Sequence, residues 1–285
     1  MVALESSILA QKLPDPSNHE ADRRMRAAIR ARGAVPAVTA IVRGQPVAGL
    51  DDADFERFLS RSGISKVSAR DIPWAVARGL DGATTVAASL CICAQAGLPV
   101  FATGGIGGVH RVLSGAAFDE SADLLELSRS SVVTVCAGAK SILDLHATVE
   151  RLETLGVAVV GFRTGEFPGF FTAHTGLRVA AVANSAGEIA SAFLASRALG
   201  RPGALLVVQP PPAAAALDAQ LVEEAVSKAL TAAATAEISG AALTPFLLAE
   251  VERATGGRSL AANLALLEAN AALAAEIAVA LADSR

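Results

Sequence analysis

The feature that most constrains the fold is an alternation of short apolar segments with amphipathic helical stretches. The apolar segments are rich in β-branched residues, and they cover 2–4, 37–42, 100–103, 132–137, 157–162, 179–182 and 205–209. Strands that are apolar throughout, rather than at every second position, are typical of a parallel sheet buried on both faces. The sequence therefore predicts an α/β fold, with a mainly parallel sheet sandwiched between helices in α/β/α layers.

Helical patterns fill the spaces between these segments, at 19–32, 84–96, 141–155 and 185–199. Gly44-Gln45 separates two apolar segments and predicts one antiparallel hairpin. From 217 onward the pattern is helical, with breaks near Ser239-Gly240 and Gly256-Gly257 and a long helix over 260–282. No repeat or long linker divides the chain, which predicts a single domain over 1–285.

Composition excludes several classes of function. The chain is 52% hydrophobic and 18% charged, with a net charge of −4, which excludes disorder and gives no basic field for nucleic acid. No apolar segment approaches the roughly 20 residues of a membrane span, and the first residues carry no basic segment. The three cysteines are odd in number and lie in apolar stretches, which favours a reducing compartment. We expect a cytoplasmic protein that binds neither nucleic acid nor membrane.

Only four of the 24 basic residues are lysines, and Lys140 ends the apolar segment that begins at Val132. Arginine keeps its proton, whereas a desolvated lysine can lose it and act as a nucleophile. A lysine at the end of a buried strand is therefore a candidate for covalent chemistry. The alternative is a lysine that only extends its ammonium group from a strand end into water.

A glycine-rich loop, 103–111, follows another predicted strand. Four glycines in five positions allow backbone N–H groups to approach an anion, so a phosphate or sugar cradle is one interpretation. A tight strand-to-helix turn is the other. The loop is not a dinucleotide fingerprint, because His110 stands where the third glycine would be. His110 is the one histidine of interest.

Two further groups carry carboxylates. Glu5 follows an apolar strand, where partial desolvation would raise the pKa of a carboxyl group toward general-acid use; an exposed acid beyond a strand end is the alternative. Asp119 and Asp123 are four residues apart, so one helix face could present both to a hydrated divalent cation. The alternative, which the spacing alone favours, is a solvated helix N-terminus, where acids interact well with the helix dipole.

Together, several segments resemble the pseudouridine-5′-phosphate glycosidase family over essentially the whole chain. The segments occur in the family's order, and they are 3–6, 66–71, 101–111, 121–124, 136–144, 244–248 and 259–263. The resemblance implies reversible cleavage of the C–C glycosidic bond of pseudouridine 5′-phosphate, giving uracil and ribose 5-phosphate. It also implies the layered α/β/α fold and a homotrimer.

The resemblance assigns roles to individual residues. The nucleophile falls on Lys140, the proton donor on Glu5, and the metal ligand on Asp119, with Mn²⁺ as the expected ion. Substrate contacts fall on Lys66, Val86, Ser121, Ala122 and Asp123. To these we add Thr103 and His110 as phosphate or sugar contacts, and Asn263 as a substrate or loop-positioning residue.

The implied mechanism is an imine between Lys140 and C1′ of the ring-opened sugar, which provides an electron sink for C–C cleavage. Two other hypotheses remain at this point: a Schiff-base aldolase acting on a sugar phosphate, and a sugar-phosphate-binding protein without activity. The chain departs from the family in an early start before Glu5, in Gln11-Lys12-Leu13, and in Gln209-Pro210-Pro211, where Asn-Pro is common.

Overall fold

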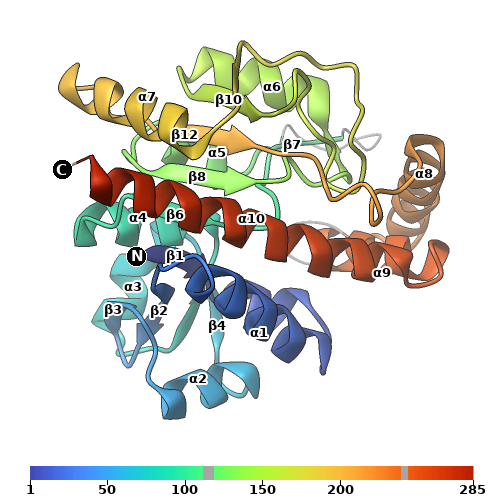
Figure 1. The fold of residues 1–285 in the computed structure, drawn as a ribbon. Coiled ribbons are helices and arrows are strands. Elements are labelled where there is room, and N and C mark those ends of the chain that lie inside the picture. The colour runs from blue at the N-terminus through green and yellow to red at the C-terminus, as the bar shows by residue number, and fades with distance from the viewer. Residues whose placement is uncertain (112–118, 239–242, 285) are drawn as a thin grey trace.

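The computed structural model describes residues 1–111, 119–238 and 243–284. These residues form a ten-stranded, mostly parallel sheet with helices packed on both faces (Figure 1). The predicted α/β fold is confirmed. The main sheet runs in the order β11-β10-β12-β8-β6-β1-β2-β5-β4, and β3 pairs with β2.

The strands are mostly short and buried. Those of the main sheet are β1 (Val2–Glu5), β2 (Pro36–Val42), β3 (Gln45–Ala48), β4 (Ser65–Val67), β5 (Gly82–Thr84), β6 (Val100–Ala102), β8 (Val133–Cys136), β10 (Ala158–Phe162), β11 (Ala181–Ala183) and β12 (Leu205–Val208). Two further strands, β7 (Val109–His110) and β9 (Leu143–Asp144), pair antiparallel in a small separate sheet. Strand β2 pairs antiparallel with both β3 and β5, and the first of these pairs is the predicted hairpin.

Ten α-helices surround the sheet in the described residues. They are α1 (Ser17–Arg30), α2 (Asp52–Leu59), α3 (Ile72–Ala77), α4 (Val86–Ala96), α5 (Ala122–Leu127), α6 (Leu145–Thr154), α7 (Ala186–Ala198), α8 (Ala219–Thr235), α9 (Leu243–Ala254) and α10 (Arg258–Asp283). A π-helical turn, η1 (Ile8–Lys12), follows β1, and a 3₁₀ turn, η2 (Ala69–Asp71), follows β4. The short elements between residues 52 and 84 were not predicted, because segments of three to eight residues show little periodicity.

The predicted helix over 141–155 begins later than expected. Helix α6 starts at Leu145, because the Asp144 side chain caps it by accepting a hydrogen bond of 2.9 Å from the Ala147 N–H. Residues 143 and 144 instead pair with β7. Lys140 therefore lies in a loop between β8 and β9, and not at a helix N-terminus.

The C-terminal third is helical, as predicted. The break at Gly256 and Gly257 is present, with φ values of 60° and 79° that favour glycine. The predicted break at 239–240 lies outside the described residues. Helix α10 crosses the molecule beside α1 (Figure 1) and also packs against α7, β6 and β8.

Helix α10 explains the apolar composition of this region. It is the one helix in the described residues that is long and apolar enough to cross a membrane, which is weak evidence for a span. In the fold, 56% of the most apolar 18-residue stretch of this helix is buried. Burial against the sheet accounts for that composition without a membrane.

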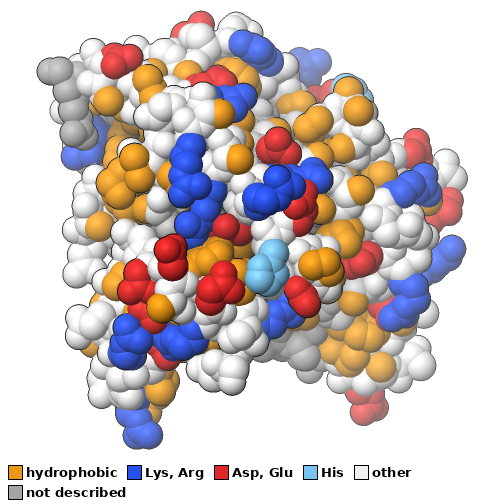
Figure 2. All heavy atoms as spheres, turned by 60° about the horizontal axis from the view of Figure 1, so that its bottom comes forward, with side chains coloured by type: hydrophobic (Ala, Val, Ile, Leu, Met, Phe, Trp, Pro, Cys, Tyr) orange, Lys and Arg blue, Asp and Glu red, His pale blue; other side chains and the backbone are white. Residues whose placement is uncertain are grey.

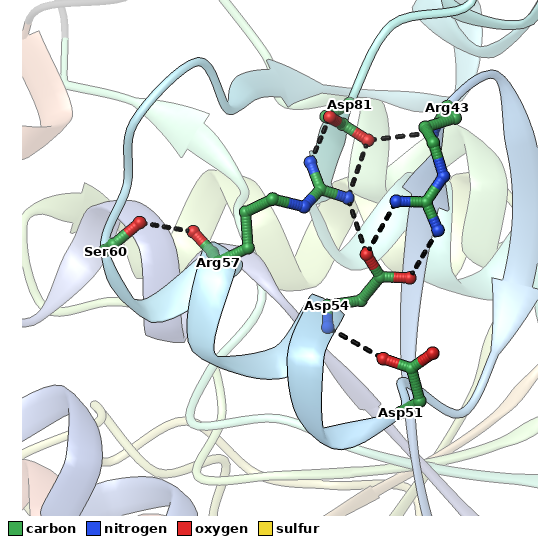
Figure 3. Close-up of polar contacts among 6 residues, drawn as sticks. All are labelled: Arg43, Asp51, Asp54, Arg57, Ser60 and Asp81. Atoms are coloured by element: carbon green, nitrogen blue, oxygen red, sulfur yellow. Dashed lines mark hydrogen bonds and ion pairs between the residues drawn. The ribbon is translucent and has the colours of Figure 1, made fainter.

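A cluster of ion pairs connects α2 to Arg43, which follows β2, and to Asp81, which precedes β5 (Figure 3). Asp54 accepts hydrogen bonds from Arg43, at 2.9 and 3.0 Å, and from Arg57, at 2.8 Å. Arg57 also pairs with Asp81, which precedes β5. The Arg57 hydrogen bond holds the pKa of Asp54 below its usual value. Burial alone would raise the pKa of Asp81, but hydrogen bonds from Arg57 and Arg43 outweigh it.

Charges of both signs are interspersed on the face drawn in Figure 2. Ion pairs within one helix, such as Arg23–Glu20 and Arg26–Asp22 on α1, place opposite charges side by side.

Candidate active site

The candidate site lies at the carboxyl ends of three neighbouring strands, β8, β6 and β1. Glu5 ends β1, the glycine loop follows β6, and Lys140 lies four residues beyond β8. The register places Leu4 beside Ala102 and Ala102 beside Val135, so the next residues of all three strands emerge at one level. Carboxyl ends of neighbouring parallel strands are the usual position of ligand sites in open α/β sheets.

Glu5 is buried and held by hydroxyl groups. The whole residue is 1% exposed. The Thr103 hydroxyl donates to Glu5 Oε1 at 2.5 Å, and the Ser7 hydroxyl donates to Oε2. The exposed-acid alternative for Glu5 is therefore wrong. Thr103, which we predicted to contact phosphate or sugar, directs its hydroxyl to the carboxylate of Glu5.

A network of buried hydroxyl groups lies behind Glu5. Thr84 Oγ1 is 2.9 Å from Thr39 Oγ1 and 3.2 Å from Ser6 Oγ, and the Ser89 hydroxyl lies within 3.1 Å of it. These side chains join β1, β2, β5 and α4 at the level of Glu5. The network fixes the β1 carboxyl end because each hydroxyl is buried and hydrogen-bonded.

The glycine loop packs closely against its neighbours. A Cβ on Gly105 would come within 2.5 Å of the Phe170 ring, one on Gly107 within 2.2 Å of Ser121 Oγ, and one on Gly108 within 2.3 Å of Thr148 Oγ1. Several N–H groups of the loop bond to the protein itself: Ile106 to Gly138 O, Gly107 to Asp123, Val109 to Thr148 and His110 to Asp119 O. These contacts favour the tight-turn interpretation for this part of the loop.

The Lys140 loop is shaped by Gly138. Its φ is 79°, and a Cβ there would lie 1.9 Å from the Pro168 carbonyl oxygen. The Lys140 N–H then donates to Ile106 O at 3.2 Å, and the Leu143 N–H donates to Lys140 O at 3.0 Å. The loop therefore lies directly on the glycine loop, with the Lys140 residue half-buried.

His110 lies near Asp119 and near Lys140. The His110 Nε2 atom is 3.9 Å from Asp119 Oδ2. Burial lowers the pKa of His110; Asp119 opposes this, and the positive charge of Lys140 adds to it. His110 and Lys140 are therefore close enough for their charges to interact. The described residues contain no group of three or more His, Cys, Asp or Glu side chains that could hold a metal ion.

Cys136 does not compete with Lys140 as a nucleophile. It is buried at the end of β8, four residues before the lysine. Burial raises the pKa of its thiol to about 12. The thiol therefore keeps its proton near neutral pH, and the reactive thiolate is not formed.

Asp123 connects two parts of the site. Its carboxylate oxygens accept hydrogen bonds from Ala87 N at 3.0 Å and from Gly107 N at 2.8 Å. The first bond reaches the start of α4, where Val86 is buried; the second reaches the glycine loop. Ser121 caps α5, which begins at Ala122. These predicted substrate-binding residues lie together, and the Asp123 carboxylate holds them in place.

Two predicted residues lie farther away. Lys66 is exposed on β4, at the end of the strand order, with β5 and β2 between it and β1. In the sheet, Lys66 nevertheless lies beside Ala83, and Ala83 lies beside Ala40. Ala40 directly follows Thr39, the residue that pairs with Glu5. Asn263 lies half-buried in the second turn of α10.

Asn270, which lies two turns beyond Asn263, was not predicted from the sequence. It is 1% exposed, and its amide donates to Thr103 O and Gly104 O. An uncharged polar residue among the apolar residues of this helix could have pointed to it, because such a residue is seldom buried without a hydrogen-bonding role. Ser7 was missed because a serine after a strand has no distinctive pattern.

These residues and their setting define an α/β enzyme with its site at the strand ends. A family model described as indigoidine synthase A-like protein matches residues 1–280. A pseudouridine-5′-phosphate glycosidase from Gemmatimonas aurantiaca is 62% identical, over 99% of this chain and 92% of the relative. One from Herpetosiphon aurantiacus is 50% identical, over 100% and 93%. The chain belongs to the indigoidine synthase A-like family, and the predicted resemblance is confirmed.

Solved structures agree with this assignment. The prealnumycin C-glycosynthase AlnA, in complex with ribulose 5-phosphate, is 40% identical with a TM-score of 0.91, covering 100% of this chain and 92% of that one. An indigoidine synthase A-like protein from Thermotoga maritima is 39% identical with a TM-score of 0.89, covering 98% and 91%.

Proposed function

We propose that this protein catalyses the reversible cleavage of pseudouridine 5′-phosphate to uracil and ribose 5-phosphate. The observation that carries the proposal is the full-length identity of 62% to a relative with that activity in its name. Glu5 at the end of β1 and Lys140 beyond β8 lie at the same edge of the sheet, with β6 between their strands, and this arrangement supports the proposal.

Glu5 is suited to donate the first proton. Its carboxyl group is buried, which shields it from bulk water, and the Thr103 and Ser7 hydroxyl groups fix its orientation. The first step requires Glu5 in its protonated form. In the proposed step, Glu5 protonates the ribose ring oxygen. The C1′–O4′ bond breaks, and the electron pair leaves with O4′ as a new hydroxyl group.

Lys140 supplies the nucleophile. Its neutral amine forms a bond to C1′ as the ring opens, and the nitrogen lone pair then forms the C1′=N bond. The C1′–C5 bond to the base breaks in this step, and the electron pair goes to C5 of uracil, which takes up a proton. Water adds to the imine, and release of the lysine leaves the ribose 5-phosphate aldehyde.

Other residues have places in this scheme. The Ser141 hydroxyl is buried, follows Lys140 in the chain and has no hydrogen-bond partner among the described residues, and we assign it to a further contact with the substrate. His110, Lys66, Val86, Asn263 and the 121–123 segment remain proposed substrate contacts. The charge of Lys66 is suited to an anionic group at the outer side of the site.

Asp119 remains the proposed manganese ligand, and the homotrimer remains the proposed assembly. One exposed carboxylate fits an ion that keeps most of its water ligands, which is common for small hard divalent cations. When bound, such an ion would supply positive charge near a phosphate group.

A second candidate is C-glycoside formation from a sugar phosphate and another carbon nucleophile. The likeness to a C-glycosynthase favours it, because C-glycoside synthesis makes the kind of bond that the glycosidase reaction breaks, between C1′ and a carbon atom. The aldolase hypothesis gives Glu5 no task. Incubation of ribose 5-phosphate with uracil, and separately of glyceraldehyde 3-phosphate with acetaldehyde, distinguishes these reactions by which substrate is consumed.

The deciding experiment is borohydride reduction of the protein with ribose 5-phosphate, followed by peptide mass spectrometry. We expect a reduced sugar adduct on Lys140 and loss of that adduct in Lys140→Arg. An adduct on another lysine, or none in a protein that cleaves pseudouridine 5′-phosphate, contradicts the imine mechanism.

A further inference from the structure

Asn270 is a buried amide at the centre of the C-terminal helix α10. Its Nδ2 group donates to Thr103 O at 2.8 Å and to Gly104 O at 3.2 Å. Its Oδ1 atom accepts a hydrogen bond of 2.9 Å from Gln209 Nε2. Both donors and one acceptor of the side chain are thus used, in a residue that is 1% exposed.

Only an amide fits this position. Two backbone carbonyl oxygens face one side-chain atom, so that atom must be a nitrogen with two hydrogens to donate. The opposite atom faces the N–H of Gln209, so it must accept. An aspartate would direct carboxylate oxygen toward carbonyl oxygen, and a leucine would remove the hydrogen bonds to Thr103 O, Gly104 O and Gln209 Nε2.

The two carbonyl groups link Asn270 to both parts of the candidate site, the proposed acid and the loop that carries Lys140. Thr103 carries the hydroxyl that donates to Glu5 at 2.5 Å. Gly104 O also accepts the Ala137 N–H at 2.9 Å, and Ala137 lies in the loop that leads to Lys140. One side chain therefore touches the backbone that holds the acid and the backbone that holds the nucleophile loop.

Gln209 adds a third connection. It follows β12, and its own N–H donates to Cys136 O at 3.1 Å, at the end of β8. Its side chain then reaches Asn270 on the helix. The carboxyl ends of β6, β8 and β12 are thus joined to one point of α10.

We propose that Asn270, oriented by Gln209, is a positioning residue that sets Glu5 and Lys140 relative to each other. It does not touch the reacting atoms. It acts on catalysis through Thr103 and Gly104. The kinetic part of this inference rests on the proposed function; the structural part does not.

The test compares three full-length variants with the parent protein. Asn270→Leu keeps the approximate size and removes all three hydrogen bonds, and Gln209→Met removes only the outer one. Glu276→Gln is the control on the same helix, because that carboxylate pairs with Arg32 at the surface. Circular dichroism and thermal unfolding select the folded variants.

The first measurement is steady-state cleavage of pseudouridine 5′-phosphate. We expect kcat to fall roughly 10- to 100-fold in Asn270→Leu with KM changed less than about threefold, because misplacement of reacting groups acts on the chemical step. Gln209→Met should show a smaller loss, and the double variant should lose less than the product of the two. A folded Asn270→Leu with kcat within about twofold of the parent overturns the proposal.

The second measurement is hydrogen exchange followed by mass spectrometry, which needs no substrate. Asn270→Leu should lose protection in peptides covering both 100–107 and 135–141, whereas Glu276→Gln should not. If the parent does not cleave pseudouridine 5′-phosphate, the proposed function fails, and this measurement still decides the positioning role. Unchanged exchange, or uniform loss over the whole chain, contradicts it. Should Asn270→Leu not fold, Gln209→Met decides the question: kcat within about twofold of the parent together with unchanged exchange in both peptides overturns the proposal.

Discussion

The Thr103 hydroxyl donates a 2.5 Å hydrogen bond to the Glu5 carboxylate, across the boundary between two neighbouring parallel strands. Each residue emerges at the carboxyl end of its strand, and both are buried. Thr103 is therefore a positioning residue for the proposed acid, and its hydroxyl is engaged before any substrate binds.

Removal of this hydroxyl should weaken both activity and stability. In Thr103→Val the carboxylate loses a buried donor, and we expect a stability loss of about 1.5–3 kcal/mol. We expect kcat to fall about tenfold or more. Chemical denaturation and steady-state kinetics measure these effects. Thr103→Ser keeps the donor and serves as the control; equal losses in both variants would assign the effect to the methyl group instead.

Lys140→Arg should abolish turnover while it keeps the positive charge. Arginine does not provide a neutral amine near pH 7, so no imine forms. We expect kcat to fall on the order of a thousandfold or more. Lys228→Arg, on α8, is the matched control and should retain activity. Substantial turnover by Lys140→Arg would exclude a covalent role for this residue.

Gly138→Ala should destabilise the loop that carries Lys140. The φ of 79° is unfavourable for alanine, and the new Cβ would collide with the Pro168 carbonyl. We expect a loss of about 1–3 kcal/mol, measured by urea unfolding. Gly165→Ala has open space and no left-handed backbone, so it should change stability little. Similar effects of the two substitutions would contradict this account.

The ion-pair cluster of α2 should make stability depend on pH. Arg57 and Arg43 lower the folded-state pKa of Asp54, and the pKa of Asp81 is also lowered. A lowered folded pKa stabilises the fold above the unfolded value of 3.8, and this contribution is lost as the pH falls through the folded pKa.

Asp54→Asn should therefore be less stable than the parent at pH 7, by about 2 kcal/mol. The difference should shrink progressively below pH 3.8. Thermal unfolding at a series of pH values measures it. Asp52→Asn, an exposed position on the same helix, is the control. A difference that does not depend on pH would show that the charge of Asp54 is not the cause.

Chelation should reduce activity if Asp119 holds a divalent ion. We expect activity to fall after treatment with EDTA and to return with Mn²⁺. Asp119→Asn should need a higher Mn²⁺ concentration, by roughly tenfold, for the same activity. A metal titration of both proteins measures the shift. Full activity after complete metal removal would rule out the manganese prediction.

Much of the fold was predictable because strongly apolar segments with clear boundaries stand out in the sequence. Strand β8 and helix α10 belong to this group, and so does the β2–β3 hairpin with its glycine turn. Elements such as β4 and α5 were not predictable, because β4 has one apolar residue among three and α5 spans fewer than two helical turns. The start of α6 was misplaced because Ser141 and Ile142 suit a helix, whereas the Asp144 cap begins it later.

The sequence by itself determined the α/β class and drew attention to Glu5, Lys140 and the glycine loop. It did so because apolar periodicity and rare residue types are local properties of the chain. Only the tertiary structure decided which groups meet. Thr103 bonds to Glu5 across 98 residues, and Asn270 bonds to Thr103 across 167. Contacts at that separation depend on strand order and helix packing, which no local pattern encodes.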